Sequence, residues 1–150
     1  MPPTDGATRP PTDGANLPPP QRLPVVTSAD VAVARRAART LATALSFDTV
    51  AAERVVLAVS ELATNLVRYA RRGDVILSPL TTARGHGLQV ESRDDGPGIA
   101  DLGQALEDGF SSGGGLGHGL PAVQRLMDEV TIETAPSGTR IVARTWLTRR

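Results

Sequence analysis

Three short segments carry residue types that could do chemistry on a nucleotide, and the first is Glu61-Leu62-Ala63-Thr64-Asn65. Glu61 and Asn65 are four residues apart, a spacing that places both side chains on one face of a helix, one turn apart. A carboxylate can accept a proton, and an amide oxygen can bind Mg²⁺. The pair is therefore a candidate for phosphoryl transfer. An ordinary solvated polar face is the alternative, and for this pair alone it is the simpler one.

The second segment is Asp94-Asp95-Gly96-Pro97-Gly98, directly after a predicted strand. Glycines let a backbone approach a ligand closely, and an aspartate at a strand end can accept a hydrogen bond from an exocyclic amine. Such a charge-assisted bond contributes about 1.5–3 kcal/mol, enough to select adenine. The alternative is a plain Asp-Gly turn.

The third segment is the glycine-rich run from Gly113 to Gly119, followed by Leu120 and Pro121 at the start of a predicted helix. The free N–H groups and the positive dipole end of a helix N-terminus can hold a polyphosphate. A flexible linker is the alternative. The amphipathic pattern that follows, Leu120, Val123, Leu126 and Met127, favours a phosphate-binding loop.

Helices with one apolar face must position these segments. The first is expected from a cap at Ser28 or Asp30 to about Leu45, and the second from a cap at Asp48 to about Arg71, stopped by Gly73. A third should start at Pro121, a favourable first helical position, and reach Met127 or Asp128. The expected buried positions of the first two helices are Val31, Ala34, Ala38, Leu41, Leu45, Val55, Val59, Leu62, Leu66 and Tyr69.

Two predicted hairpins supply the strands. Residues 75–80 and 87–92 are joined through Gly85-His86-Gly87, and residues 130–134 and 139–147 flank the turn Pro136-Ser137-Gly138. The expected fold class is α+β, a two-layer α/β sandwich with a mixed, mostly antiparallel sheet and helices on one face.

Composition bounds the function. The 150 residues have zero net charge, no cysteine and no lysine, which argues against a nucleic-acid-coating protein and excludes thiolate zinc sites and the P-loop. No apolar run could span a bilayer and no secretory signal is evident, so we expect a cytoplasmic protein without a membrane partner. Residues 1–24 contain a repeated octapeptide, PPTDGATR and PPTDGANL, and are expected to form a disordered Pro-rich tail ahead of one domain over residues 25–150.

The order of the three segments, followed by Gly138-Thr139, resembles the N, G1 and G2 boxes and the terminal Gly-Thr of the GHKL (HATPase_c) superfamily, which has the Bergerat ATP-binding fold. The resemblance covers Val26 to Trp146. The stretches SELATNLVRYA, DDGPGI, EDGFSSGGGLGHGLPAVQRLMDE and SGTRI look most like the stand-alone bacterial serine/threonine kinases of the RsbT type, with the RsbW and SpoIIAB anti-sigma factor kinases as relatives.

This resemblance implies a role for each matching residue. Glu61 would be the general base, Asn65 would coordinate Mg²⁺, and Asp94 would bind the adenine amine. Thr139 would support the base through a water. Residues 100–112 would form the ATP lid. His118 stands where the family usually has leucine, and we expect it to pack or to be exposed rather than to act in catalysis. The residues expected to contact the nucleotide are Asn65, Asp94, Gly96, Gly98, Gly115, Leu116, Gly117, His118, Gly119, Leu120 and Thr139.

The resemblance further implies an ATP- and Mg²⁺-dependent serine/threonine protein kinase in a bacterial partner-switching pathway of stress or sigma-factor signalling. Its substrate would be a STAS-domain antagonist or scaffold protein, and a PP2C-type phosphatase, a sigma factor or a second copy of the chain would be further partners. The alternative is a nucleotide-controlled binding module, an anti-sigma factor or phosphatase activator with little kinase activity. A histidine-kinase fragment fits less well, because the chain has no dimerisation helix with a phosphoacceptor histidine.

Overall fold

A computed structural model describes residues 17–70, 72–96 and 119–147 of the chain. Its elements run in the order β1 (Gln21–Pro24), α1 (Ser28–Ala44), α2 (Thr49–Tyr69), β2 (Gly73–Thr82), β3 (Gly85–Asp94), α4 (Gly119–Leu126), β4 (Glu129–Ala135) and β5 (Gly138–Trp146). None of the helices in these ranges combines the length and the hydropathy that a bilayer crossing requires.

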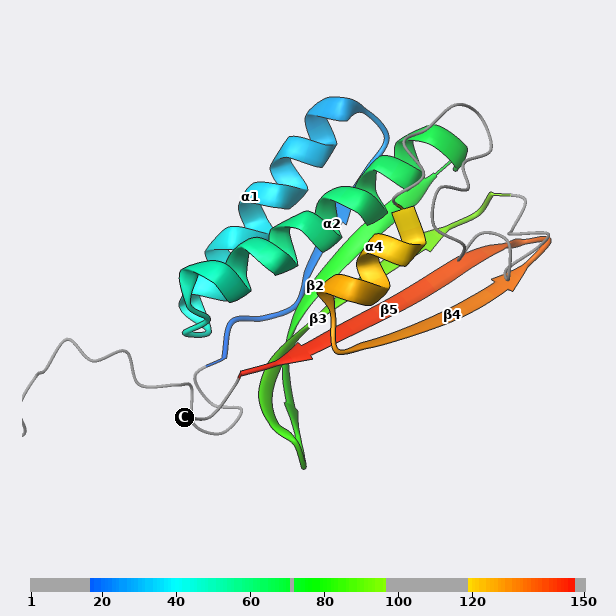
Figure 1. Cartoon of the computed structure of the whole chain (residues 1–150). Helices are drawn as coiled ribbons and strands as arrows, with labels where there is room; N and C mark the ends of the chain where they lie inside the picture. The colour runs from blue at the N-terminus through cyan, green and yellow to red at the C-terminus, as the bar shows by residue number, and fades with distance from the viewer. Residues whose placement is uncertain (1–16, 71, 97–118, 148–150) are drawn as a thin grey trace, which may run out of the picture.

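The strands form one sheet in the order β1-β2-β3-β5-β4, and each neighbouring pair is antiparallel. Figure 1 shows α1, α2 and α4 on the same face of this sheet, with α2 between the other two. The described part of the chain is therefore the two-layer α+β sandwich expected from the sequence.

The helical layer is built on small and branched apolar side chains. Val55, Val59 and Leu62 of α2 are completely buried and face Val75, Leu77 and other apolar residues of the sheet. This burial follows the 3.6-residue period that predicted the helix. Burying each such side chain contributes about 1.5–3 kcal/mol, so the buried face fixes how α2 is rotated on the sheet.

The start of α1 differs from the prediction. Its N-cap is Thr27, not Ser28 or Asp30, and Asp30 is the third helical residue of a capping box. The Asp30 carboxylate accepts hydrogen bonds from the N–H groups of Val26 and Thr27. The reciprocal pairing satisfies donors at both ends of the first turn, which explains why an acidic residue here marks the helix start without capping it.

The N-cap of α2 is Asp48, as predicted, but the helix ends at Tyr69, two residues early. Tyr69 is 46% exposed, so its expected place on the buried stripe is wrong. Gly73 does not stop the helix; it is the buried first residue of β2. A Cβ atom at Gly73 would lie 2.6 Å from Leu66 Cδ2, so glycine lets the strand pack against the end of α2.

The β2–β3 hairpin is longer than predicted, and its turn falls at residues 83–84 rather than at Gly85-His86-Gly87. Gly85 has φ of +113°, a conformation that favours glycine, which is why the strand can begin there. The β4–β5 hairpin turns at Pro136 and Ser137, as predicted. Helix α4 begins at Gly119, two residues before the predicted Pro121.

The tail was predicted to extend to residue 24, and its last part is wrong. Residues Gln21–Pro24 form β1 and pair with β2, from Gln21 opposite Leu77 to Pro24 opposite Asp74. Proline is compatible with an edge strand, where its missing N–H disrupts no ladder on the outer side. Residues 1–16 lie outside the described ranges, so the rest of the domain division stays a prediction.

Candidate functional site

The site is centred on the side of α2 that turns away from its buried stripe. Glu61 and Asn65 are both half-buried there, whereas Leu62 and Leu66 are buried against the core. Among the described residues, neither the Glu61 carboxylate nor the Asn65 amide has a hydrogen-bonding partner. Half-buried polar groups without partners are costly to keep unless a ligand or water satisfies them. Both side chains are therefore available for binding or chemistry.

The start of α4 lies directly against Asn65. A Cβ atom at Gly119 would lie 3.1 Å from Asn65 Nδ2 and 3.4 Å from its Oδ1. A longer side chain at residue 119 would therefore press on the amide. The helix predicted to present its N-terminus to phosphate thus begins beside the residue predicted to bind Mg²⁺, although 54 residues separate them along the chain.

Asp94 ends β3 in a tight turn. Its Oδ1 accepts hydrogen bonds from the N–H of Gly96 at 2.8 Å and from the N–H of Thr139 at 3.3 Å. Within the described residues, its Oδ2 accepts no hydrogen bond. One oxygen therefore holds the turn while the other is free to receive an amine. A carboxylate with one bonded and one unbonded oxygen fits the predicted contact with the adenine amine.

The Asp94 turn is held against the end of α2. A Cβ atom at Gly96 would lie 3.2 Å from the carbonyl oxygen of Tyr69. The Asp95 N–H donates to the Arg72 carbonyl at 3.2 Å, and the Arg72 N–H donates to Asp95 Oδ1 at 2.9 Å. The third segment thus reaches α2 at Asn65, and the second reaches it about one turn later, at Tyr69.

Thr139 lies at the Asp94 end of the site. Its side chain pairs with the Thr134 hydroxyl at 3.0 Å, and its N–H binds Asp94. Among the described residues Thr139 makes no direct hydrogen bond to Glu61, and its support of the base through a water stays a prediction. The register of β3 and β5 explains the bond to Asp94, because Thr139 sits directly opposite Asp94.

The structure limits how Leu120 could contact a nucleotide. Its side chain is 6% exposed and belongs to the hydrophobic core, so only its backbone could face a nucleotide. The remaining expected contacts, Gly98, Gly115, Leu116, Gly117 and His118, and the expected lid at residues 100–112, lie outside the described residues.

A bound metal ion would depend on few protein ligands. The described residues contain no group of three or more histidine, aspartate or glutamate side chains able to hold a metal. Mg²⁺ commonly keeps one or two protein oxygens and completes its shell with substrate phosphates and water. A single unpartnered amide oxygen at Asn65, beside the start of α4, fits that arrangement.

The opposite face of the sheet carries a polar network that sequence analysis missed. Glu91 is only 5% exposed and accepts hydrogen bonds from Arg93 and, at 3.0 Å, from Arg140. Burial alone would raise the pKa of Glu91, but the hydrogen bonds and charges of the two arginines outweigh it and lower the pKa. Strand alternation was the available signal, since Glu91 sits between the core residue Val90 and the buried Ser92 and therefore faces the other side of the sheet.

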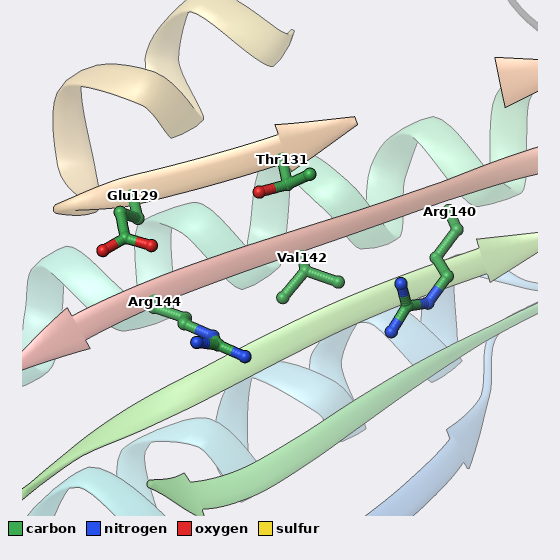
Figure 2. Close-up of a pocket in the computed structure, with 5 residues that line it drawn as sticks. All are labelled: Glu129, Thr131, Arg140, Val142 and Arg144. Atoms are coloured by element: carbon green, nitrogen blue, oxygen red, sulfur yellow. The ribbon is translucent and has the colours of Figure 1, made fainter. Parts of the chain in front are cut away.

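A shallow pocket of about 240 Å³ lies on this same open face, lined by Glu129, Thr131, Arg140, Val142 and Arg144. Figure 2 shows these side chains on one face of β4 and β5. Arg140 is bound to Glu91 and Arg144 to Gln89 at 2.9 Å. The pocket is therefore separated by the whole sheet from Glu61, and its arginines are already engaged.

Comparisons with known proteins agree with this arrangement. Residues 25–145 match the family model described as a histidine kinase-like ATPase domain. The chain is 43% identical over 124 residues to the serine/threonine-protein kinase RsbT of Bacillus subtilis (strain 168), an alignment that spans 82% of this chain and 93% of RsbT. The predicted resemblance is confirmed.

Solved structures share the fold. The RsbU and RsbW domains of Rv1364c from Mycobacterium tuberculosis match with a TM-score of 0.63 at 18% identity, over 89% of this chain and 34% of that one. The Erythrobacter litoralis EL346 blue-light activated histidine kinase matches with a TM-score of 0.54 at 24% identity, over 80% of this chain and 41% of that one. This chain thus spans less than half the length of either structure.

Proposed function

The chain belongs to the histidine kinase-like ATPase family, and from this premise we propose that it transfers the γ-phosphoryl group of ATP to a serine or threonine hydroxyl of a partner protein. One observation carries the proposal: Glu61 is a half-buried carboxylate without a partner among the described residues, one turn from Asn65, which lies against the start of α4. The similarity to a curated serine/threonine kinase supports it.

Glu61 acts as the general base in this reaction. Its carboxylate takes the proton of the acceptor hydroxyl as the new oxygen–γ-phosphorus bond forms, and the bond from the γ-phosphorus to the β,γ-bridging oxygen breaks to release ADP. General-base catalysis of this kind contributes about 10²–10⁴-fold. Because the transition state needs positioning more than covalent chemistry, a base on a rigid helix is well suited to it.

The other site residues bind and orient the nucleotide. Asn65 would hold Mg²⁺, which when bound neutralises phosphate charge. The N-terminus of α4 supplies backbone N–H groups and a positive dipole end for the phosphates. The free Oδ2 of Asp94 accepts the adenine amine, while the bonds of Oδ1 to Gly96 and Thr139 keep that carboxylate from rotating.

The substrate we propose is a STAS-domain antagonist or scaffold protein in a bacterial partner-switching pathway of stress or sigma-factor signalling. The support is the 43% identity to RsbT over nearly its full length. A PP2C-type phosphatase or a sigma factor would be a further partner of the same chain.

The deciding experiment incubates the full chain with γ-labelled ATP, Mg²⁺ and purified STAS-domain proteins of the same organism. We expect label on one STAS protein, at a serine or threonine located by mass spectrometry, and no label when Mg²⁺ is chelated. Stable ATP-dependent complexes without any transfer of label would overturn the kinase and favour a nucleotide-controlled binding module.

A further inference from the structure

Two large apolar side chains of α2 are left exposed in line with Glu61. Val50 is 73% exposed and Leu57 is 51% exposed. Leu57 is four residues before Glu61, and Val50 is seven residues before Leu57. At 3.6 residues per turn these three side chains share one stripe of the helix, opposite its buried face. The stripe Val50–Leu57–Glu61 runs roughly 16 Å along the axis, at 1.5 Å per residue.

Neighbouring helices border this stripe without covering it. On one side, Arg39 of α1 pairs with Glu53 of α2 at 2.9 Å. On the other, Arg54 of α2 donates to the carbonyl of Arg125 in α4 at 2.7 Å. Figure 1 shows α2 lying between these two helices. The stripe is therefore an open track with a helix on each side, and the proposed base stands on it.

The charge around the track is positive. Arg54 and Arg68 are both exposed and stand seven residues before and after Glu61, about two helical turns away on the same side of α2. Arg54 lies at the edge of the stripe, where it bonds to α4. The described helices carry six arginines and three acidic residues. Asp30 is used in the capping box and Glu53 in an ion pair, so Glu61 is the acid of these helices without a protein partner among the described residues.

We propose that the track Val50–Leu57–Glu61 is the docking surface for the acceptor segment of the phosphorylated protein. An apolar side chain of that segment packs on Leu57, its acidic side chains meet Arg54 and Arg68, and its serine or threonine hydroxyl reaches Glu61. An acceptor segment is the occupant that fits, because a hydroxyl must reach Glu61 and the apolar surface starts one turn away from it. The inference rests on the proposed kinase function.

Leu57→Gln tests the track, with Val33→Gln as its matched control. Val33 is 47% exposed but lies on α1, outside the stripe. We expect Leu57→Gln to raise the KM for the acceptor protein about tenfold, as for the loss of roughly half a buried leucine, with kcat and ATP affinity unchanged. Val33→Gln should change none of the three values. Equal effects of the two variants, or none from Leu57→Gln, would overturn the track.

A second readout does not depend on phosphate transfer. Benzoylphenylalanine at position 57 should cross-link to the STAS-domain protein upon illumination, and the same group at position 33 should not. If position 57 cross-links while the unmodified chain transfers no phosphate, the kinase proposal fails and the track stands. If phosphate is transferred while position 57 gives no cross-link and Leu57→Gln keeps its KM, the track fails and the kinase stands. Loss of both signals overturns both.

Discussion

Glu61 and Glu91 are two carboxylates on opposite sides of the molecule with opposite surroundings. Glu61 lies on the outer side of α2, half-buried and without a hydrogen-bonding partner among the described residues. Glu91 lies on the open face of the sheet, 5% exposed and held by Arg93 and Arg140. The more buried acid is therefore the structural one. In this protein an acidic side chain is available for chemistry when the fold gives its carboxylate oxygens no hydrogen-bond donor.

The difference has a physical cause in the two element types. Adjacent strands bring the side chains of β3 and β5 within reach of one another, so that Glu91 meets an arginine from the neighbouring strand. A helix turns its outward side chains away from its neighbours. Glu61 therefore meets solvent or a ligand rather than a cation of the same chain.

The largest expected effect is that of Glu61→Ala on phosphate transfer. Loss of the base should lower kcat for the acceptor protein by at least about 100-fold. The free energy of unfolding should change by less than about 0.5 kcal/mol, because no partner loses a contact. Quench-flow transfer assays and urea titrations measure the two quantities, and nucleotide affinity serves as the control. Undiminished transfer would remove Glu61 from the role of base.

Asp94 shares a property with each of these two acids. One of its oxygens is hydrogen-bonded within the fold, as in Glu91, and the other has no partner among the described residues, as in Glu61. Asp94→Asn tests the unbonded oxygen. Asparagine keeps an oxygen for the Gly96 and Thr139 N–H groups but loses the charge that binds an amine. ATP affinity should fall about 10- to 100-fold, in line with the loss of a charge-assisted hydrogen bond. Calorimetry with ATP and with GTP measures the change. An ATP affinity equal to that of the unmodified chain would contradict the adenine contact.

Glu91→Gln should lower the stability of the fold and leave phosphate transfer unchanged, the reverse of what we expect for Glu61→Ala. Removing this charge leaves Arg93 and Arg140 without their acceptor, but both guanidinium groups are about half exposed and can be hydrated. We therefore expect a loss of about 1–2 kcal/mol in the free energy of unfolding, below the range for fully buried pairs. Urea titration measures it. Phosphate transfer per folded molecule should stay unchanged, and a selective loss of transfer would end the contrast between the two acids.

The smallest expected effect is the pH dependence of stability. The arginines hold the pKa of Glu91 below its ordinary value of 4.5. Its contribution is therefore fully present above that value and is lost as the pH falls through the lowered pKa of the folded state. Asp30 and Glu53 also have lowered pKa values, from the Thr27 N–H and from Arg39 respectively. Glu91→Gln should flatten only part of the acid-side slope, and an unaltered slope would contradict the assignment.

Much of the fold could be predicted because its signals are local. The apolar period placed α1, α2 and α4, the Asp48 cap placed the start of α2, and Pro136-Ser137-Gly138 placed the β4–β5 turn. The predictions of secondary structure and burial were wrong where contacts between segments far apart in the sequence outweigh the local conformational preference. Residues Gln21–Pro24 become a strand because β2 offers an edge, and Tyr69 is exposed because α2 ends there against Gly73 and Gly96.

The sequence by itself determined which residue types lie one helical turn apart, which turn carries Asp94 and which helix follows the glycines, because spacing, turn chemistry and period are properties of short segments. Only the tertiary structure decided that Gly119 packs against Asn65, that the Thr139 N–H binds Asp94, that Glu91 is satisfied by arginines and that Leu57 stays exposed beside the proposed base. These are contacts between segments far apart in the chain, and they depend on strand register and on the packing of helices against the sheet, which no short segment specifies.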